Sequence, residues 1–152
     1  MKEERQGSTG KGRPVAMKIE QVRATPIGEI EVVGEDRRRT RIGEFDRVLG
    51  GGVIPGSMIL IGGDPGIGKT TLLLQALPRL ASKDQPVLYV SGEESPRQIK
   101  MRGQRLGIDH PNLLILAETS LEQILKAVQE IQPAALVVDA IQTVYTEQIT
   151  SA

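Results

Sequence analysis

The stretch GGDPGIGKTT, residues 62–71, constrains this chain more than any other part of it. Its core fits G-x-x-x-x-G-K-[ST], a pattern in which glycines let backbone N–H groups turn inward around phosphate oxygens. SMILIGG precedes the loop as an apolar run of strand length, and TLLLQALPRLASK follows it with helical periodicity. Strand, glycine-rich loop and helix therefore stand in the order that a phosphate-binding loop requires.

The residues of this loop divide by chemical task. Lys69 can reach the β and γ phosphates of ATP as a point charge, and Thr70 can offer its hydroxyl to Mg²⁺. The N-terminus of the following helix adds partial positive charge. We predict that nine residues bind the nucleotide: Gly63, Asp64, Pro65, Gly66, Ile67, Gly68, Lys69, Thr70 and Thr71.

Two later apolar runs end in carboxylates. PVLYVS leads to Glu93 and Glu94, and LVVD ends at Asp139. Because open α/β sheets bind ligands at the carboxyl ends of their strands, we predict that Thr70 and Asp139 hold Mg²⁺, Asp139 mainly through water. Glu94, with Glu93 beside it, is predicted to polarise the attacking water, which makes Glu94, Glu93 and Lys69 the candidate catalytic residues. The alternative for each glutamate is an acid that pairs with the dipole of the next helix.

The order of elements indicates an α/β fold with a mostly parallel sheet and helices on both faces. SPRQIKMRGQRLG predicts a helix with Ser95 as N-cap, and NLLILAE predicts a strand. TSLEQILKAVQEIQP predicts a helix that is capped by Thr119 or Ser120 and ends before Pro133, with the strand AALVVDA after it.

Four features nearer the N-terminus complete this prediction. IGEFDRVLGGG predicts a short helix that the glycines end, and Pro78 predicts a kink or early stop in the helix after the loop. AMKIEQV and GEIEVVG predict weak strands, and residues 1–14 read as a mobile lead-in.

Composition excludes several kinds of site and partner. The chain has 152 residues and no cysteine, which excludes disulfides and cysteine-ligated zinc, and His110 is its one histidine. With 19 basic and 19 acidic residues, net charge favours no polyanion, and no apolar run is long enough to span a membrane. We therefore expect a cytoplasmic protein with no membrane contact. The arginines at 37, 38, 39 and 41 fit either a grip on DNA phosphates or a solvated charge run.

Several longer stretches resemble the bacterial RadA (Sms) family of DNA repair ATPases in the RecA superfamily. They are IGEFDRVLGGGVIPGSMILIGGDPGIGKTTLLLQ, LYVSGEES, NLLILAETSLEQIL and LVVDAIQTVYTEQITSA, and the resemblance covers about residues 40–152. It implies a RecA-like ATPase core that uses ATP and Mg²⁺, with the site roles given above. It also implies recombinational repair of single-stranded or branched DNA by a homo-oligomeric ring.

The sequence differs from the family pattern in several places. The family's four-cysteine zinc finger, its Lys-Asn-Arg-Phe-Gly motif and its Lon-like domain are missing, as is a later strand that lies between the loop strand and the Asp139 strand. We expect residues 1–24 to be a flexible lead-in and residues 25–152 to be a partial ATPase domain. Position 41 is arginine where relatives usually have glycine, and Ala140 replaces a usual serine.

Two main hypotheses remain open from the sequence. The first is a DNA-dependent ATPase of the RadA type. The second is a truncated module that binds ATP or ADP with Mg²⁺ but hydrolyses it little, because groups that act on the γ-phosphate in trans are missing. A clock-type or DnaB-type ATPase of the same superfamily is a third reading.

Overall fold

The computed structural model describes residues 24–29 and 36–147, and the chain divides into two compact units, Met1–Val33 and Gly34–Ala152. In the first unit, a 3-10 turn, η1 (Ile27–Glu29), is closed by a hydrogen bond from the Glu29 N–H to the Pro26 carbonyl. The expected strand over GEIEVVG is therefore wrong at its start, because proline favours such a turn. The remainder of that stretch, the expected strand AMKIEQV and nearly all of the lead-in lie outside the described residues.

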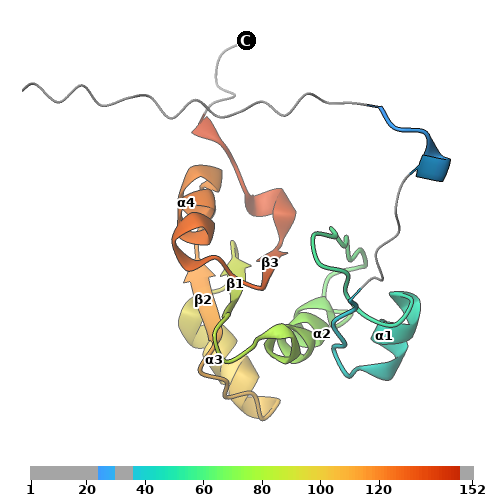
Figure 1. Ribbon diagram of the computed structural model, residues 1–152. Coiled ribbons are helices and arrows are strands. Elements are labelled where there is room, and N and C mark those ends of the chain that lie inside the picture. The colour runs from blue at the N-terminus through green and yellow to red at the C-terminus, as the bar shows by residue number, and fades with distance from the viewer. Residues whose placement is uncertain (1–23, 30–35, 148–152) are drawn as a thin grey trace, which may run out of the picture. The chain divides into compact units, whose positions relative to one another are not determined.

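The second unit contains a parallel sheet of three strands in the order β2-β1-β3 (Figure 1). The strands are β1 (Val87–Ser91), β2 (Leu113–Ala117) and β3 (Ala135–Asp139). They confirm three of the strands predicted from the sequence. The register sets Ser91 beside Asp139, so the carboxyl ends of β1 and β3 lie at one edge of the sheet.

Helices cover both faces of this sheet, as predicted. The chain passes from β1 to β2 through α3 (Pro96–Arg105), then returns past β1 to β3 through α4 (Leu121–Ile131). Because right-handed crossovers in opposite directions leave a sheet on opposite sides, α3 and α4 lie on different faces. Alternate residues of β1 therefore enter two cores: Val87 and Tyr89 pack with Leu74, Leu77, Leu80 and Ile99, and Leu88 and Val90 pack with Ile124.

The helix after the glycine-rich loop ends where proline predicts. α2 (Lys69–Ala76) gives way to a 3-10 turn, η2 (Leu77–Leu80), in which Pro78 follows the first residue. Proline has no N–H to continue the α-helical ladder, so the last turn tightens. Leu74 and Leu77 remain almost fully buried against the sheet, and each such side chain contributes roughly 1.5–3 kcal/mol through burial.

The other helix ends also follow their sequence signals. α1 (Gly43–Val48) ends before Gly50, whose φ of 71° is the left-handed conformation that glycine favours. Ser95 caps α3 in a reciprocal capping box with Gln98. Ser120 is the N-cap residue of α4, although its hydroxyl bonds to Glu122 and makes no capping bond to the backbone.

One predicted strand is wrong. Residues 57–63, SMILIGG, form no strand, and Met58 and Leu60 are 97% and 86% exposed. A strand exists only through its hydrogen-bonded neighbours, and within the described residues this stretch has no neighbouring strand. The glycine-rich loop is therefore joined to the unit through α2 and not through a sheet strand.

Candidate functional site

The glycine-rich loop has a backbone that its glycines make possible. Gly63, Gly66 and Gly68 have φ angles of 152°, 80° and 106°, a region that other residues rarely adopt. Gly68 is also the N-cap residue of α2, so the loop leads directly into the N-terminus of a helix. Exposed free N–H groups at such a terminus attract anions.

The predicted nucleotide-binding residues occupy this loop and the first turn of α2. Lys69, Thr70 and Thr71 are half-buried in that turn. The remaining predicted residues are exposed in the loop: Gly63, Asp64, Pro65, Gly66, Ile67 and Gly68. The surface that the pattern predicted for phosphate contact is therefore open to solvent.

Lys69 folds back over the loop. Its ammonium Nζ donates hydrogen bonds to the carbonyl oxygens of Gly63 and Asp64, at 2.6 and 2.8 Å. An ammonium has three N–H donors, so these two bonds leave one donor for another acceptor. The loop carbonyls thus fix a positive charge beside the backbone that the glycines shape.

Thr70 and Asp139 meet although 69 positions separate them in the sequence. The Thr70 hydroxyl donates to Oδ2 of Asp139 at 2.6 Å, and the Tyr89 hydroxyl donates to the same oxygen at 2.5 Å. The sequence predicted both residues for the magnesium site, Thr70 through its hydroxyl and Asp139 mainly through water, and in the structure they are in direct contact. Tyr89 was missed. The available signal was its place in VLYVS, two residues before Ser91 and therefore on the face that Asp139 shares.

Burial fixes the protonation of Tyr89. Its side chain is 1% exposed, and burial raises the pKa of its phenol far above the ordinary value of about 10. The hydrogen bond to the Asp139 carboxylate raises that pKa further. Tyr89 therefore stays a neutral donor that holds one carboxylate oxygen of Asp139 in place.

Glu94 forms an ion pair that the sequence did not predict. Its two carboxylate oxygens accept hydrogen bonds from both terminal nitrogens of Arg102 on α3, each at 2.6 Å. The two side chains are 29% and 30% exposed, so this pair is partly shielded from water. Helical periodicity could not predict this pair, because Glu94 lies in the loop before α3 and only Arg102 lies on the helix.

Glu93 lies in a cleft of about 320 Å³ at the carboxyl ends of β1 and β2. Glu94 and Glu118 line the same cleft. The carboxylate of Glu118 accepts hydrogen bonds from the backbone N–H groups of Thr119 and Ser120, which lower its pKa. The cleft is therefore acidic, with Glu93 as its exposed carboxylate.

Gly92 allows the edge between β1 and β3 to close. A Cβ atom at this position would overlap the side chain of Thr143 in η3 (Ile141–Thr143) and would lie 2.7 Å from its Cβ. The Gly92 N–H also donates to the carbonyl of Asp139 at 3.0 Å. Close packing against Thr143 therefore requires glycine at this position of SGEES, which the sequence did not predict.

The predicted residues fall into two groups. Thr70 and Asp139 make direct contact, with Lys69 adjacent in the chain, whereas Glu93 and Glu94 follow β1, the strand beside β3. Within residues 24–29 and 36–147, no three histidine, cysteine or carboxylate side chains group in a way that could hold a metal. In the same residues, no helix is both long and apolar enough to cross a membrane.

Comparisons with known proteins place this arrangement in a family. The family model described as "ATPase: KaiC" matches residues 38–117, just over half of the chain. A DNA repair protein RadA of Bacillus subtilis is 57% identical over 128 residues, which cover 84% of this chain and 28% of that protein. RadA proteins of Halalkalibacterium halodurans and Pseudomonas aeruginosa are 54% and 48% identical, over 84% and 88% of this chain.

These alignments cover more of the chain than the residues on which the resemblance was based. The chain spans 28–29% of the length of these three relatives. The matched residues include the glycine-rich loop and the SGEES segment that follows β1. The chain therefore belongs to the KaiC family of ATPases and, as its motifs indicated, is related to the bacterial DNA repair protein RadA.

Proposed function

We propose that this chain is the nucleotide-binding part of a RadA-type ATPase that acts in DNA repair. The observation that carries the proposal is the 2.6 Å contact between Thr70 and Asp139. It joins the first turn after the glycine-rich loop to the carboxyl edge of the sheet, where this class of fold binds ligands.

ATP phosphates would be held by the loop residues Gly63 to Thr71. The positive φ angles of its glycines and the helix start at Lys69 support this role, because both direct N–H groups toward an anion. Lys69 would exchange its bonds to the Gly63 and Asp64 carbonyls for bonds to phosphate oxygens. The ammonium group would remain at the loop and would bind the ligand in place of the loop carbonyls.

The oxygens of Thr70 and Asp139 fit a magnesium site. Thr70 would hold Mg²⁺ through its hydroxyl and Asp139 mainly through water, and their 2.6 Å contact brings both groups to one place. Both groups are hard oxygen ligands of the kind that this ion prefers. Bound Mg²⁺ supplies charge neutralisation on the phosphates. Tyr89 keeps the carboxylate of Asp139 oriented by donating to it.

Water activation is proposed for Glu94, with Glu93 beside it. The support is position: both follow β1 at the edge where β3 ends in Asp139. The bidentate bonds to Arg102 use one acceptor site on each carboxylate oxygen of Glu94, which leaves a second site on each oxygen for a water molecule.

That ion pair also supports the second candidate function, a nucleotide-binding module with little hydrolysis. The bonds to Arg102 hold the Glu94 carboxylate against α3, and binding of phosphate and Mg²⁺ by the described residues does not depend on its reaching a water molecule. DNA binding, assembly into a homo-oligomeric ring and hydrolysis stimulated by single-stranded or branched DNA are proposals that rest on the RadA relatives.

Phosphate release from ATP, with and without single-stranded DNA, separates the two candidates. For the ATPase we expect turnover that Lys69→Ala and Glu94→Gln both abolish. Matched changes at exposed positions of α4, Lys126→Ala and Glu130→Gln, should leave the rate unchanged. Turnover at background level in the unmodified chain would favour the binding module.

Binding is measured separately, by titration with a fluorescent ATP analogue in the presence of Mg²⁺. Both candidates predict binding that Lys69→Ala weakens strongly and Lys126→Ala does not. If Lys69→Ala bound the analogue as tightly as the unmodified chain, the assignment of the loop would be wrong.

A further inference from the structure

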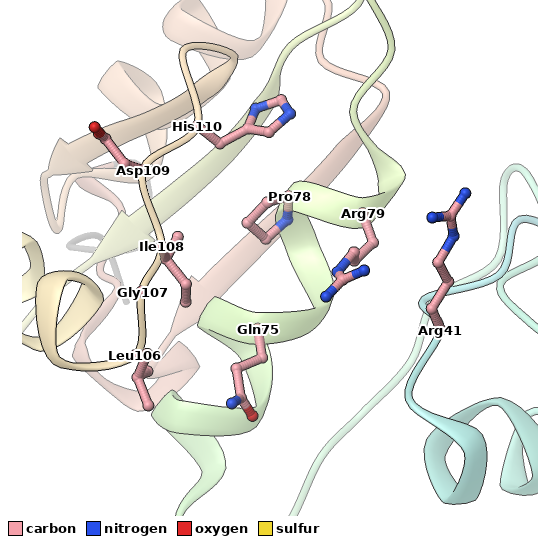
Figure 2. Close-up of a pocket in the computed structure, with 9 residues that line it drawn as sticks. All are labelled: Arg41, Gln75, Pro78, Arg79, Leu106, Gly107, Ile108, Asp109 and His110. Carbon is pink, nitrogen blue, oxygen red and sulfur yellow. The ribbon is translucent and has the colours of Figure 1, made fainter.

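A second cavity lies away from the proposed nucleotide site. It has a volume of about 480 Å³ and is formed by Arg41, by the end of α2 with η2, and by residues 106–110 (Figure 2). η2 precedes β1, and residues 106–110 precede β2. The cavity therefore lies at the amino ends of the strands, whereas Asp139 and Glu93 lie at their carboxyl ends.

The lining of this cavity carries uncompensated positive charge. Arg41 and Arg79 enter from two different segments (Figure 2), and within the described residues neither guanidinium makes an ion pair or a side-chain hydrogen bond. Asp109 is the acidic residue of the lining. Its carboxylate is already paired with Lys100 at 2.9 Å, so it does not neutralise the arginines.

His110 adds a ring N–H donor to the same wall. Its Nδ1 accepts a hydrogen bond from the Asn112 N–H at 3.2 Å, so the nitrogen that carries a proton is Nε2. The side-chain amide of Gln75 also lines the cavity. Cations and N–H donors from three segments thus face one space, which is the chemistry that phosphate oxygens require.

Arg41 is held firmly at its place in this wall. Its φ of 61° lies in the left-handed region, and its N–H donates to Oδ2 of Asp46 at 3.0 Å. Oδ1 of the same buried carboxylate accepts from the N–H and the hydroxyl of Thr40, at 2.9 and 2.7 Å. Asp46 therefore fixes the turn from which Arg41 projects.

We propose that this cavity binds phosphates of a single-stranded nucleic acid backbone. Arginine suits phosphodiester oxygens, and the lining contains no phenylalanine, tyrosine or tryptophan on which a base could stack. Contact is therefore with the backbone and does not depend on sequence. The choice of a nucleic acid strand over another phosphate ester rests on the proposed function in DNA repair.

The test is the salt dependence of binding to a labelled thymidine oligonucleotide, measured by fluorescence anisotropy on the whole chain. Each phosphate contact contributes about −0.7 to the slope of log K against log salt for a single strand. Arg41→Gly and Arg79→Gln should each reduce the magnitude of that slope by about 0.7, and the double variant by about 1.4. Affinity for oligonucleotides of other sequences should fall equally.

Controls make the outcome specific to the cavity. Arg97→Ala removes an exposed arginine of α3 outside the lining and should leave the slope unchanged. Arg41→Gly suits the left-handed backbone, so its effect cannot be attributed to misfolding. An unchanged slope in the double variant, or an equal loss in Arg97→Ala, would overturn the proposal.

Two further measurements separate this proposal from the proposed function. Displacement of the oligonucleotide by inorganic phosphate at a matched phosphate concentration would point to a small-anion site and contradict a strand. Binding of the fluorescent ATP analogue with Mg²⁺ should be the same in the double variant and the unmodified chain. If the analogue binds and the oligonucleotide does not, this inference fails while the nucleotide site stands.

Discussion

The hydroxyl of Thr70 donates a 2.6 Å hydrogen bond to the carboxylate of Asp139, 69 positions later in the chain. The contact ties the first turn of α2 to the last residue of β3. Tyr89 donates to the same carboxylate oxygen from within β1. A ligand that binds at the loop therefore meets a carboxylate that the sheet has already oriented.

Changing Tyr89 to Phe removes one of the two donors to Asp139. A hydrogen bond to a charged group contributes about 1.5–3 kcal/mol, so the free energy of unfolding should fall by that order. Tyr89 orients a predicted magnesium ligand, so its loss should lower the apparent affinity for Mg²⁺ in ATP-analogue binding by about 10-fold or more. Titration of Mg²⁺ at fixed analogue concentration measures this effect. Tyr145→Phe, at a 52% exposed position, is the matched control and should change neither quantity.

The ionisation of Tyr89 predicts a loss of stability at high pH. Its pKa is raised in the native state, so above about pH 10 the unfolded chain releases the phenol proton while the native chain keeps it. The stabilisation is complete below that pH and decreases as pH rises toward the native pKa. Urea unfolding between about pH 9 and 11 should show a steeper decline for the unmodified chain than for Tyr89→Phe. Parallel declines would show that Tyr89 ionises equally in both states.

Replacing Arg102 by Ala leaves the half-buried carboxylate of Glu94 without its bidentate partner. We expect unfolding to become easier by about 1–2 kcal/mol. Arg102→Lys should recover only part of this loss, because an ammonium cannot make two parallel bonds to a carboxylate. Midpoints of urea unfolding give the comparison. Full recovery in Arg102→Lys would mean that charge alone, and not the paired geometry, holds Glu94.

Gly92→Ala should disturb the junction between β1 and β3. The new Cβ would overlap Thr143, and overpacking of this kind costs about 1–3 kcal/mol. Adding Thr143→Ala removes the overlapping hydroxyl and should restore part of the melting temperature. Gly43→Ala, which adds a Cβ where nothing lies within 4 Å, is the control and should be tolerated. Equal melting temperatures for the two glycine variants would contradict the packing argument.

Arg41→Gly should stabilise the chain although it removes a side chain. A left-handed residue other than glycine costs about 1–2 kcal/mol, partly offset by the greater freedom of glycine in the unfolded state, so a net gain of about 0.5–1 kcal/mol is expected. Arg41→Ala keeps the strain and should bring no such gain. Thermal unfolding of both variants tests this point, and a gain in Arg41→Ala equal to that in Arg41→Gly would assign the effect to charge.

Local signals determined much of the fold. The apolar runs of β1, β2 and β3, the N-cap at Ser95, and the early stop at Pro78 all act within a few residues, so their sequence patterns predicted them. The glycine-rich loop could also be predicted locally, because its φ angles depend on the glycines themselves.

The sequence by itself thus determined the order of the elements after the loop and the position of the loop, and it selected Lys69, Thr70 and Asp139 as candidate site residues. Only the tertiary structure decided which side chains meet: Tyr89 with Asp139, Glu94 with Arg102, and Arg41 with the cavity beside Arg79. It also decided that residues 57–63 form no strand, despite their apolar pattern. Contacts and strand ladders need partners far away in the chain, and no local pattern of residue types encodes that partnership.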